Sequence, residues 1–160
     1  MKLLRGILIL QVLLSACNNE PNKDGSQKID LLSIENHSYA NIADIHTTHL
    51  HLKLNVDFQK KQLKGVVRHE MINSGTTEAI FDVSGLKINN VTIGIETKEL
   101  RTNYEIRGAK DPVLGQALWV EITPETKLVN IYYETTEDSE ALDWLDSALT
   151  SSKNKPFLYT

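Results

Sequence analysis

The sequence is poor in the residues that mark several specialised protein classes. It has a single cysteine, Cys17, among 160 residues, so no disulfide can form within the chain. Four prolines and eight glycines are too few for a collagen-like or low-complexity protein. No run of lysine and arginine is present and the formal net charge is −4, which argues against a nucleic-acid-binding surface. We therefore predict no nucleic-acid partner.

Motifs with a defined chemistry are also missing. The sequence has no glycine-rich phosphate-binding loop, no nucleophile elbow around a serine and no pair of carboxylates in a convincing setting. The composition, with 41% hydrophobic and 24% charged residues, is typical of a globular protein, and the length favours one domain. The residues by themselves indicate no reaction.

The first seventeen residues, MKLLRGILILQVLLSAC, have the three parts of a secretory signal peptide. Lys2 and Arg5 form a positive flank, and the apolar run that follows has about half of the roughly 20 residues that a membrane-spanning helix needs. The end, LSAC, resembles the lipobox of bacterial lipoproteins. We predict a signal peptide over 1–16, a lipid on Cys17, and anchoring to a membrane of the bacterial cell envelope. The alternative is an ordinary cleaved signal that leaves Cys17 near the new terminus.

Residues 17–38 are predicted to form a flexible tether between this signal and the folded domain. Within this segment, NNEPNKDGSQK at 18–28 has no apolar residue, so it has no side chain to bury in a core. Ordered structure is expected to begin near Tyr39, and the folded domain is predicted over 39–160.

A strict alternation of apolar and polar residues follows Thr48. The apolar positions are Leu50, Leu52, Leu54, Val56 and Phe58. A period of two residues is typical of a half-buried β-strand, so this row is predicted to face the core. Residues 59–62 indicate a hairpin loop, and 63–72 indicate the returning strand.

Further runs rich in β-branched and aromatic residues are separated by turn signals such as Ser84-Gly85 and Thr123-Pro124. They cover 79–83, 86–95, 102–107, 117–122 and 128–134. Short strands with hairpin-length gaps and no alternation with helices predict an all-β sandwich or a related multi-sheet domain. Residues 139–150 alone have helical spacing, so a short helix or helical turn is expected there.

His46, His49 and His51 lie within six residues, and zinc sites are built from such clusters. On a strand, His49 and His51 share one face and could reach one metal, with His46 joining after a bend. These residues also fit the polar face of the predicted strand, where any polar side chain is acceptable. The strand interpretation is favoured, and no metal ligand is predicted.

The stretch HEMIN, residues 69–73, is one residue away from the H-E-x-x-H motif of zinc peptidases. That motif requires a helix, where two histidines four residues apart share a face and the glutamate acts as general base. Here Asn73 replaces the second histidine, and the segment has the pattern of a strand. No catalytic residue is predicted at this stretch.

Three stretches taken together resemble one known family. They are THLHLKLNVDFQKKQLKG at 48–65, YYETTEDSEALDWL at 132–145 and KNKPFLYT at 153–160. In this order and spacing they are similar to the N-terminal β domain of the zinc aminopeptidases of the aminopeptidase N superfamily, in the branch with leukotriene hydrolase and aminopeptidase B. The resemblance covers about 39–160 and includes the glycine at Gly65. It implies a saddle-like, all-β sandwich domain and places His49 and His51 on its first strand.

The resemblance implies that the chemistry lies elsewhere in the family. Zinc is held there by H-E-x-x-H and a later glutamate, and G-x-M-E-N and Q-x-Q segments bind the peptide. The sequence stops at Thr160, before all of these, so the β domain is expected to be incomplete. No catalytic, cofactor-binding or metal-binding residue carries over to any position, and the cofactor expected in this chain is none.

The leading hypothesis is a non-catalytic N-terminal fragment of a lipid-anchored zinc aminopeptidase. Its expected partners are the missing catalytic domain and, through that domain, peptide substrates. One alternative is a free-standing envelope lipoprotein whose β-sandwich is a binding module. Another is a metal-binding protein that uses its histidines.

Overall fold

A computed structural model describes residues 37–151 and 153–160, which form ten strands and no α-helix. The strands are β1 (Ile45–Asp57), β2 (Gln62–Asn73), β3 (Glu78–Val83), β4 (Leu86–Ile93), β5 (Leu100–Arg101), β6 (Tyr104–Asp111), β7 (Gly115–Glu121), β8 (Leu128–Thr135), β9 (Asp143–Leu145) and β10 (Phe157–Tyr159). Two 3-10 turns are also present, η2 (Glu96–Lys98) and η3 (Ser147–Leu149). The predicted all-β class is confirmed. The predicted signal peptide, Cys17 and most of the predicted tether lie outside the described residues.

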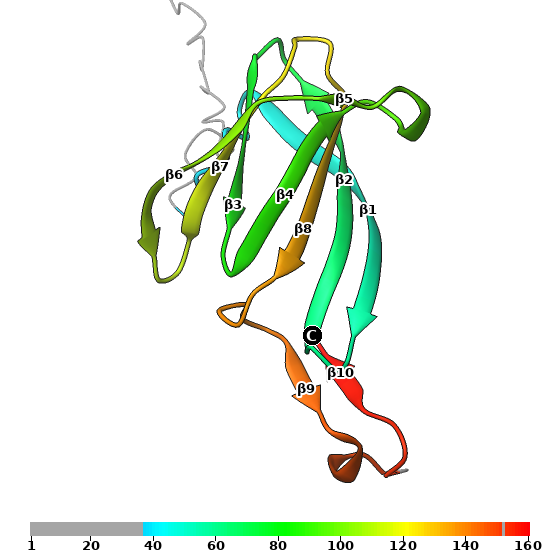
Figure 1. The fold of residues 1–160 in the computed structure, drawn as a ribbon. Coiled ribbons are helices and arrows are strands. Elements are labelled where there is room, and N and C mark those ends of the chain that lie inside the picture. The colour runs from blue at the N-terminus through cyan, green and yellow to red at the C-terminus, as the bar shows by residue number, and fades with distance from the viewer. Residues whose placement is uncertain (1–36, 152) are drawn as a thin grey trace, which may run out of the picture.

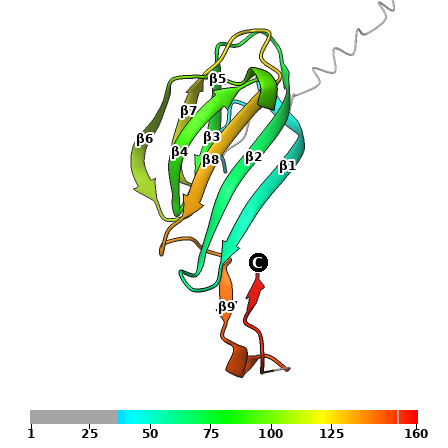
Figure 2. The same cartoon turned by 45° about the vertical axis from the view of Figure 1, so that its right-hand side comes forward.

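The strands form three antiparallel sheets (Figure 1). The large sheet has the order β1-β2-β8-β4-β5, and the small sheet has the order β3-β7-β6. The pair β9 and β10 extends away from both sheets at the end where β1 turns into β2 (Figures 1 and 2). Each of the seven strands predicted from the sequence overlaps an observed strand, whereas the short β5, β9 and β10 were not predicted.

The first hairpin forms where the alternating pattern predicts it. The β1 strand pairs with β2 from Ile45 opposite Asn73 to Asp57 opposite Gln62. The Asp57 carboxylate accepts hydrogen bonds from the backbone N–H groups of Gln59 and Lys60 at 3.0 and 2.9 Å, which fixes the turn. Opposite Leu54 lies Gly65, where a Cβ atom would be 2.0 Å from the Lys53 carbonyl oxygen. The close approach of the two strands therefore requires glycine at this position.

The core lies between the large and small sheets. Buried apolar side chains from both layers form one cluster: Ile45, Met71, Ala79, Val83, Val91, Leu118, Val120, Ile122, Val129 and Ile131. The side chain of Leu118 on β7 is fully buried, as are those of Val91 on β4 and Val129 on β8. Alternation along each strand sends every second residue into this layer, which is the arrangement of a β-sandwich.

The predicted burial of the apolar row on β1 is wrong. Leu50, Leu52, Leu54, Val56 and Phe58 are 50, 60, 38, 40 and 40% exposed, and we call these five residues the β1 ladder. The register places Leu52 opposite Val67 and Val56 opposite Leu63, so the β1 ladder is on the core side of the large sheet. The small sheet lies on the β4 side of the molecule, away from β1 (Figures 1 and 2). The small sheet therefore leaves the β1 ladder largely exposed, although Phe58 at its end packs against Trp144.

Of the two alternatives predicted for 139–150, a short helix does not form, and a single helical turn does. The chain there forms β9, which pairs with β10, followed by the single turn η3. Ala141 has a φ of 56°, which is incompatible with a right-handed helix. Leu145 and Leu149 remain 37 and 71% exposed. A short amphipathic helix is stabilised mainly by packing its apolar face, and these two leucines are not packed in this way.

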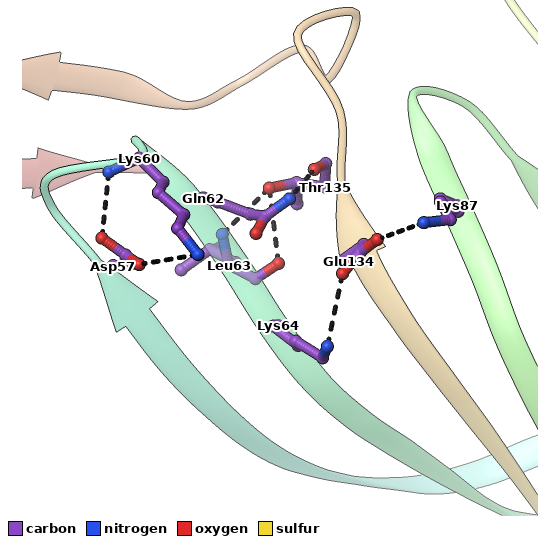
Figure 3. A network of polar contacts seen from close by, with 8 residues as sticks. All are labelled: Asp57, Lys60, Gln62, Leu63, Lys64, Lys87, Glu134 and Thr135. Carbon is purple, nitrogen blue, oxygen red and sulfur yellow. Dashed lines mark hydrogen bonds and ion pairs between the residues drawn. The ribbon is translucent and has the colours of Figure 1, made fainter.

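One end of the large sheet is held by a polar cluster around Glu134 and Thr135 (Figure 3). The Glu134 carboxylate on β8 contacts the Lys87 Nζ of β4 at 2.7 Å and the Lys64 Nζ of β2 at 3.5 Å. A hydrogen bond from Lys87 lowers the pKa of Glu134, and the charge of Lys64 lowers it further. Thr135 Oγ1 accepts a hydrogen bond from the backbone N–H of Leu63 at 2.9 Å. These contacts link the three central strands side by side.

No helix of the described residues is long and apolar enough to cross a membrane.

The core assignment predicts a contrast between two leucines. Replacing the fully buried Leu118 by alanine leaves a cavity between the sheets, and we expect the free energy of unfolding to fall by about 2–5 kcal/mol. The matched change Leu149→Ala, at a side chain that is 71% exposed, should alter it by less than about 0.5 kcal/mol. Urea unfolding of the two variants measures both quantities. Equal losses would show that the core is placed wrongly.

Candidate functional site

The outer face of the first hairpin brings two histidines and a glutamate together. The rings of His49 and His51 on β1 meet edge to face, with their centroids 4.5 Å apart. The Nε2 atom of His51 lies 2.6 Å from Glu70 Oε1, across the strand pair. This contact lowers the pKa of Glu70, and the charges of His51, His49 and Arg68 lower it further. All of these groups lie on the open face of the sheet.

Strand pairing, rather than sequence proximity, supplies the acidic neighbour of His51. Glu70 is 19 residues away in the chain, so the sequence did not indicate it. His46, the third histidine of the cluster, lines the cavity between the sheets instead of joining His49 and His51. Within 37–151 and 153–160, no three histidine, cysteine, aspartate or glutamate side chains form a group suited to a metal ion.

The His-Glu pair of the HEMIN stretch is divided between the two faces of β2. His69 faces the core side, where its ring centroid is 4.6 Å from that of Phe81, and Glu70 faces the opposite side toward His51. Asn73 is the last residue of β2, and its amide donates hydrogen bonds to the carbonyl oxygens of Thr76 and Thr123 at 3.0 Å. The predicted strand is confirmed, and these residues do not have the helical arrangement of a zinc peptidase.

His69 lines a largely apolar cavity of about 380 Å³ between the sheets. Met71, Ile80, Phe81 and Ile131 contribute to its wall. Burial in this apolar setting lowers the pKa of His69 to about 4, so the ring is neutral at pH 7. Its Nδ1 atom lies 3.0 Å from Thr47 Oγ1, which gives the neutral ring a hydrogen-bonding partner.

A second polar group, which the sequence did not indicate, is buried on the outer side of the large sheet. The fully buried Asn130 on β8 accepts a hydrogen bond from Arg68 Nε at 2.7 Å and donates to Thr92 Oγ1 at 3.1 Å. Glu99 accepts hydrogen bonds from Thr92 Oγ1 and the Tyr132 hydroxyl, both at 2.7 Å. No buried side-chain nitrogen or oxygen of the described residues lacks a partner. The group is therefore fully satisfied, as expected for a structural network.

The Asn130 network borders a wide hollow of about 770 Å³ on the same face. Lys53, Lys64, Arg68 and Tyr132 are among its lining residues. Lys64 and Arg68 already form ion pairs with Glu134 and Glu99. The arrangement holds no nucleophile beside a base and no pair of free carboxylates, so it has no evident reaction chemistry.

The three stretches that carry the family resemblance meet at one end of the molecule. Trp144 on β9 packs edge to face against Phe58 at the end of β1, with ring centroids 5.7 Å apart. Lys61 in the hairpin turn pairs with Asp146 at 3.5 Å. Leu158 on β10 is opposite Trp144 in the β9–β10 pair. Residues far apart in the sequence therefore form one contact region.

Comparison with known sequences finds aminopeptidases. No protein-family model matches the chain. It is 33% identical to leucine aminopeptidase 2 of Lodderomyces elongisporus over 112 residues, 68% of this chain and 17% of that protein. It is 32% identical to leucine aminopeptidase 2 of Ajellomyces capsulatus over 71% of this chain and 19% of that protein. It is 30% identical to leucine aminopeptidase 2-2 of Scheffersomyces stipitis over 84% of this chain and 20% of that protein.

Solved structures agree with the sequence comparison. Native leukotriene A4 hydrolase from Saccharomyces cerevisiae superposes with a TM-score of 0.68 at 26% identity, over 78% of this chain and 20% of that one. Yeast leukotriene A4 hydrolase in complex with bestatin superposes with a TM-score of 0.66 at 24% identity, over 92% of this chain and 22% of that one. The shared part is the all-β fold described above.

The predicted location in a bacterial cell envelope is contradicted by these matches. The relatives are yeast and fungal aminopeptidases and not bacterial envelope lipoproteins. The prediction depended on an apolar leader and the four letters LSAC, and a pattern this short arises easily by chance. Lipid attachment at Cys17, which lies outside the described residues, was not tested and stays a sequence prediction.

The lowered pKa of His69 predicts how stability depends on pH. An unfolded histidine binds its proton near pH 6.5, whereas folded His69 binds one near pH 4. Between these values the unfolded chain holds more protons, so the free energy of unfolding falls as the pH falls. We expect the parent to lose about 1 kcal/mol between pH 7 and 5.5 that His69→Leu does not lose.

Urea unfolding of both proteins at the two pH values measures this difference. The matched control is Met71→Ala, which alters a buried neighbour without a titratable group and should lower stability equally at both pH values. A pH dependence that persists unchanged in His69→Leu would contradict the neutral, buried state of this ring.

The sequence matches and the structural matches identify the same region of the same kind of protein. The chain spans about a fifth of the length of the relatives and solved structures that it matches. The all-β sandwich corresponds to the domain with which those aminopeptidases begin. The chain is therefore homologous to the N-terminal region of the leucine aminopeptidase and leukotriene A4 hydrolase family.

Proposed function

We propose that this chain is the non-catalytic N-terminal β domain of a zinc metallo-aminopeptidase, an enzyme that hydrolyses N-terminal residues from peptides. The main support is the match of most of the chain to the yeast leukotriene A4 hydrolase structure, at a TM-score of 0.68. The names of the relatives support the peptidase assignment.

The chemistry of the intact enzyme would reside in its catalytic domain. A zinc ion there would activate a water for attack on the peptide carbonyl, with a glutamate as general base. The described residues of this chain offer no substitute, because His69 and Glu70 are on opposite faces of β2 and His51 is engaged with Glu70. Peptide substrates would therefore bind through the catalytic domain.

The contribution of the β domain would be a rigid surface. The Asn130 network and the Glu134 cluster fix β2, β8 and β4 relative to one another from the outer face and from one end. A sheet held in this way presents a constant shape to a neighbouring domain. Its role would be to position and stabilise the catalytic domain rather than to contact the reacting atoms.

A domain exchange tests this function. Residues 37–160 replace the matching region of the Saccharomyces enzyme, about a fifth of that chain. If the two domains are equivalent scaffolds, the chimera should fold and retain zinc-dependent release of an aminoacyl arylamide within about tenfold of the parent enzyme. The 160-residue chain alone should release none, with or without added zinc.

The control chimera carries Leu118→Arg, which buries a charge in the core and should abolish folding and activity together. A soluble, folded chimera without activity would contradict the scaffold role. Zinc-dependent hydrolysis by the pure 160-residue chain would contradict its non-catalytic character.

A free-standing β-sandwich that binds a protein partner is the second candidate function. The observation that favours it is the exposed β1 ladder, an apolar surface of the kind found at protein interfaces. This candidate requires the chain to be cooperatively folded by itself. A chain that binds a hydrophobic dye strongly and lacks a fixed near-UV circular dichroism signal would contradict it.

A further inference from the structure

The strands β9 and β10, with the turn η3 between them, form an arm that stands apart from the two sheets of the sandwich (Figures 1 and 2). The two strands pair antiparallel, and the Thr150 hydroxyl between them lies 2.8 and 3.0 Å from the carbonyl oxygens of Ser147 and Lys155. Because β10 runs back toward the sheets, Thr160 lies beside the turn between β1 and β2 (Figures 1 and 2). The orientation of the arm therefore determines where this end of the chain lies.

The first attachment of the arm is an aromatic contact with the first hairpin. The ring of Trp144 on β9 meets the ring of Phe58, with the centroids 5.7 Å apart and the planes at 89°. An edge-to-face pair has a preferred geometry, because the positive edge of one ring is attracted to the negative face of the other. The contact therefore constrains the direction of the arm as well as its distance from the sheet.

Two polar attachments accompany the aromatic contact. Asp146, which follows β9, pairs with Lys61 in the turn between β1 and β2 at 3.5 Å. Before β9, the backbone N–H of Thr136 and the hydroxyl of Ser139 both donate hydrogen bonds to the carbonyl oxygen of Gly85. A Cβ atom on Gly85 would be 2.5 Å from the Cα of Ser139, so this approach requires glycine. The arm is thus attached before, at and after β9.

The aromatic contact is the strongest of these constraints on direction. The side chains of Lys61 and Asp146 are 51 and 71% exposed, and so exposed an ion pair contributes little and is screened by salt. The attachment at Gly85 ends with Ser139, and the chain then turns at Ala141, whose φ is 56°. Among the described residues, movement of the arm about this turn is therefore opposed mainly by the Phe58–Trp144 contact.

We propose that Phe58 and Trp144 are positioning residues, whose contact sets the direction of the arm and, through it, the placement of the catalytic domain in the intact enzyme. This inference rests on the proposed function, in which a catalytic domain follows the arm. Phe58 is carried by the hairpin of the large sheet, and the Glu134 cluster fixes that end of the sheet. The sheet, the aromatic contact and the arm would form one rigid connection to the domain that binds zinc.

Distances between two spin labels test the contact in the 160-residue chain. In a Cys17→Ser background, Lys53→Cys on β1 and Ala148→Cys in η3 provide two exposed labelling sites. The parent should give one narrow distribution of distances. Losing an aromatic pair shifts the equilibrium toward a detached arm by about two- to tenfold, so Phe58→Ala should add a broad second population. Trp144→Ala should do the same, and the double variant should add no more than either single change.

Phe58→Tyr retains the ring and should retain the narrow distribution. The matched control is Tyr104→Ala on β6, which removes an aromatic side chain that is 38% exposed, compared with 40% for Phe58, and should leave the distances unchanged. Because Phe58 is on the surface, its variants should keep the parent's circular dichroism. A broad distribution in the parent, unchanged distances in Phe58→Ala, or equal broadening in Tyr104→Ala would overturn the proposal.

Activity of the chimera described above separates this inference from the proposed function. A chimera with Phe58→Ala should keep its fold and its zinc but lose about tenfold or more in kcat/KM, because small errors in placement slow a reaction strongly. The Phe58→Tyr chimera should match the unmodified one. Full activity with Phe58→Ala would overturn the positioning role alone.

A folded, zinc-loaded but inactive unmodified chimera would instead contradict the proposed function, and with it the placement of a catalytic domain by the arm. The spin-label distances would still decide whether the Phe58–Trp144 contact directs the arm, because they require no activity.

Discussion

The central strand β8 is the element on which the described structure depends. It pairs with β2 on one side and β4 on the other, and its two faces bind different partners. Val129 and Ile131 point into the core, whereas Asn130 between them holds the Arg68 and Thr92 side chains on the outer face. Because an unpaired buried amide is costly, Asn130 fixes the alignment of β2 and β4 more strictly than apolar packing alone.

The two halves of the large sheet have different environments. The half next to the small sheet is a well-packed sandwich, with Val91, Leu118 and Val129 fully buried. The half formed by the β1–β2 hairpin contributes Ile45 and Met71 to this core, but the β1 ladder, which keeps the same apolar alternation, stays at least 38% exposed. A sheet that displays an uncovered apolar row at a free edge tends to acquire a partner, either a strand or a second sheet. The exposed row is therefore as informative about function as any polar cluster.

Most strands could be predicted from the sequence because alternation and turn residues are local properties. The environment of each face could not, since it depends on which strands become neighbours. The alternating pattern predicts that the β1 ladder is buried, although its side chains are exposed. Glu70 contacts His51 only because the two strands pair. The helical spacing of 139–150 gives only one helical turn, because Ala141 adopts a positive φ and Leu149 stays exposed. The buried Asn130 network also required the register to be known.

The histidines show how secondary structure decides what a motif can do. On a helix, the His and Glu of a zinc peptidase motif act at one site. On β2 the same pair is split by the pleat, so that His69 becomes a neutral core residue and Glu70 a surface partner of His51. The similarity to aminopeptidases is one of sequence and fold, and in this chain the Phe58–Trp144 contact joins the segments of family resemblance. Under the proposed function, a domain of this kind would support catalysis without supplying any reacting group.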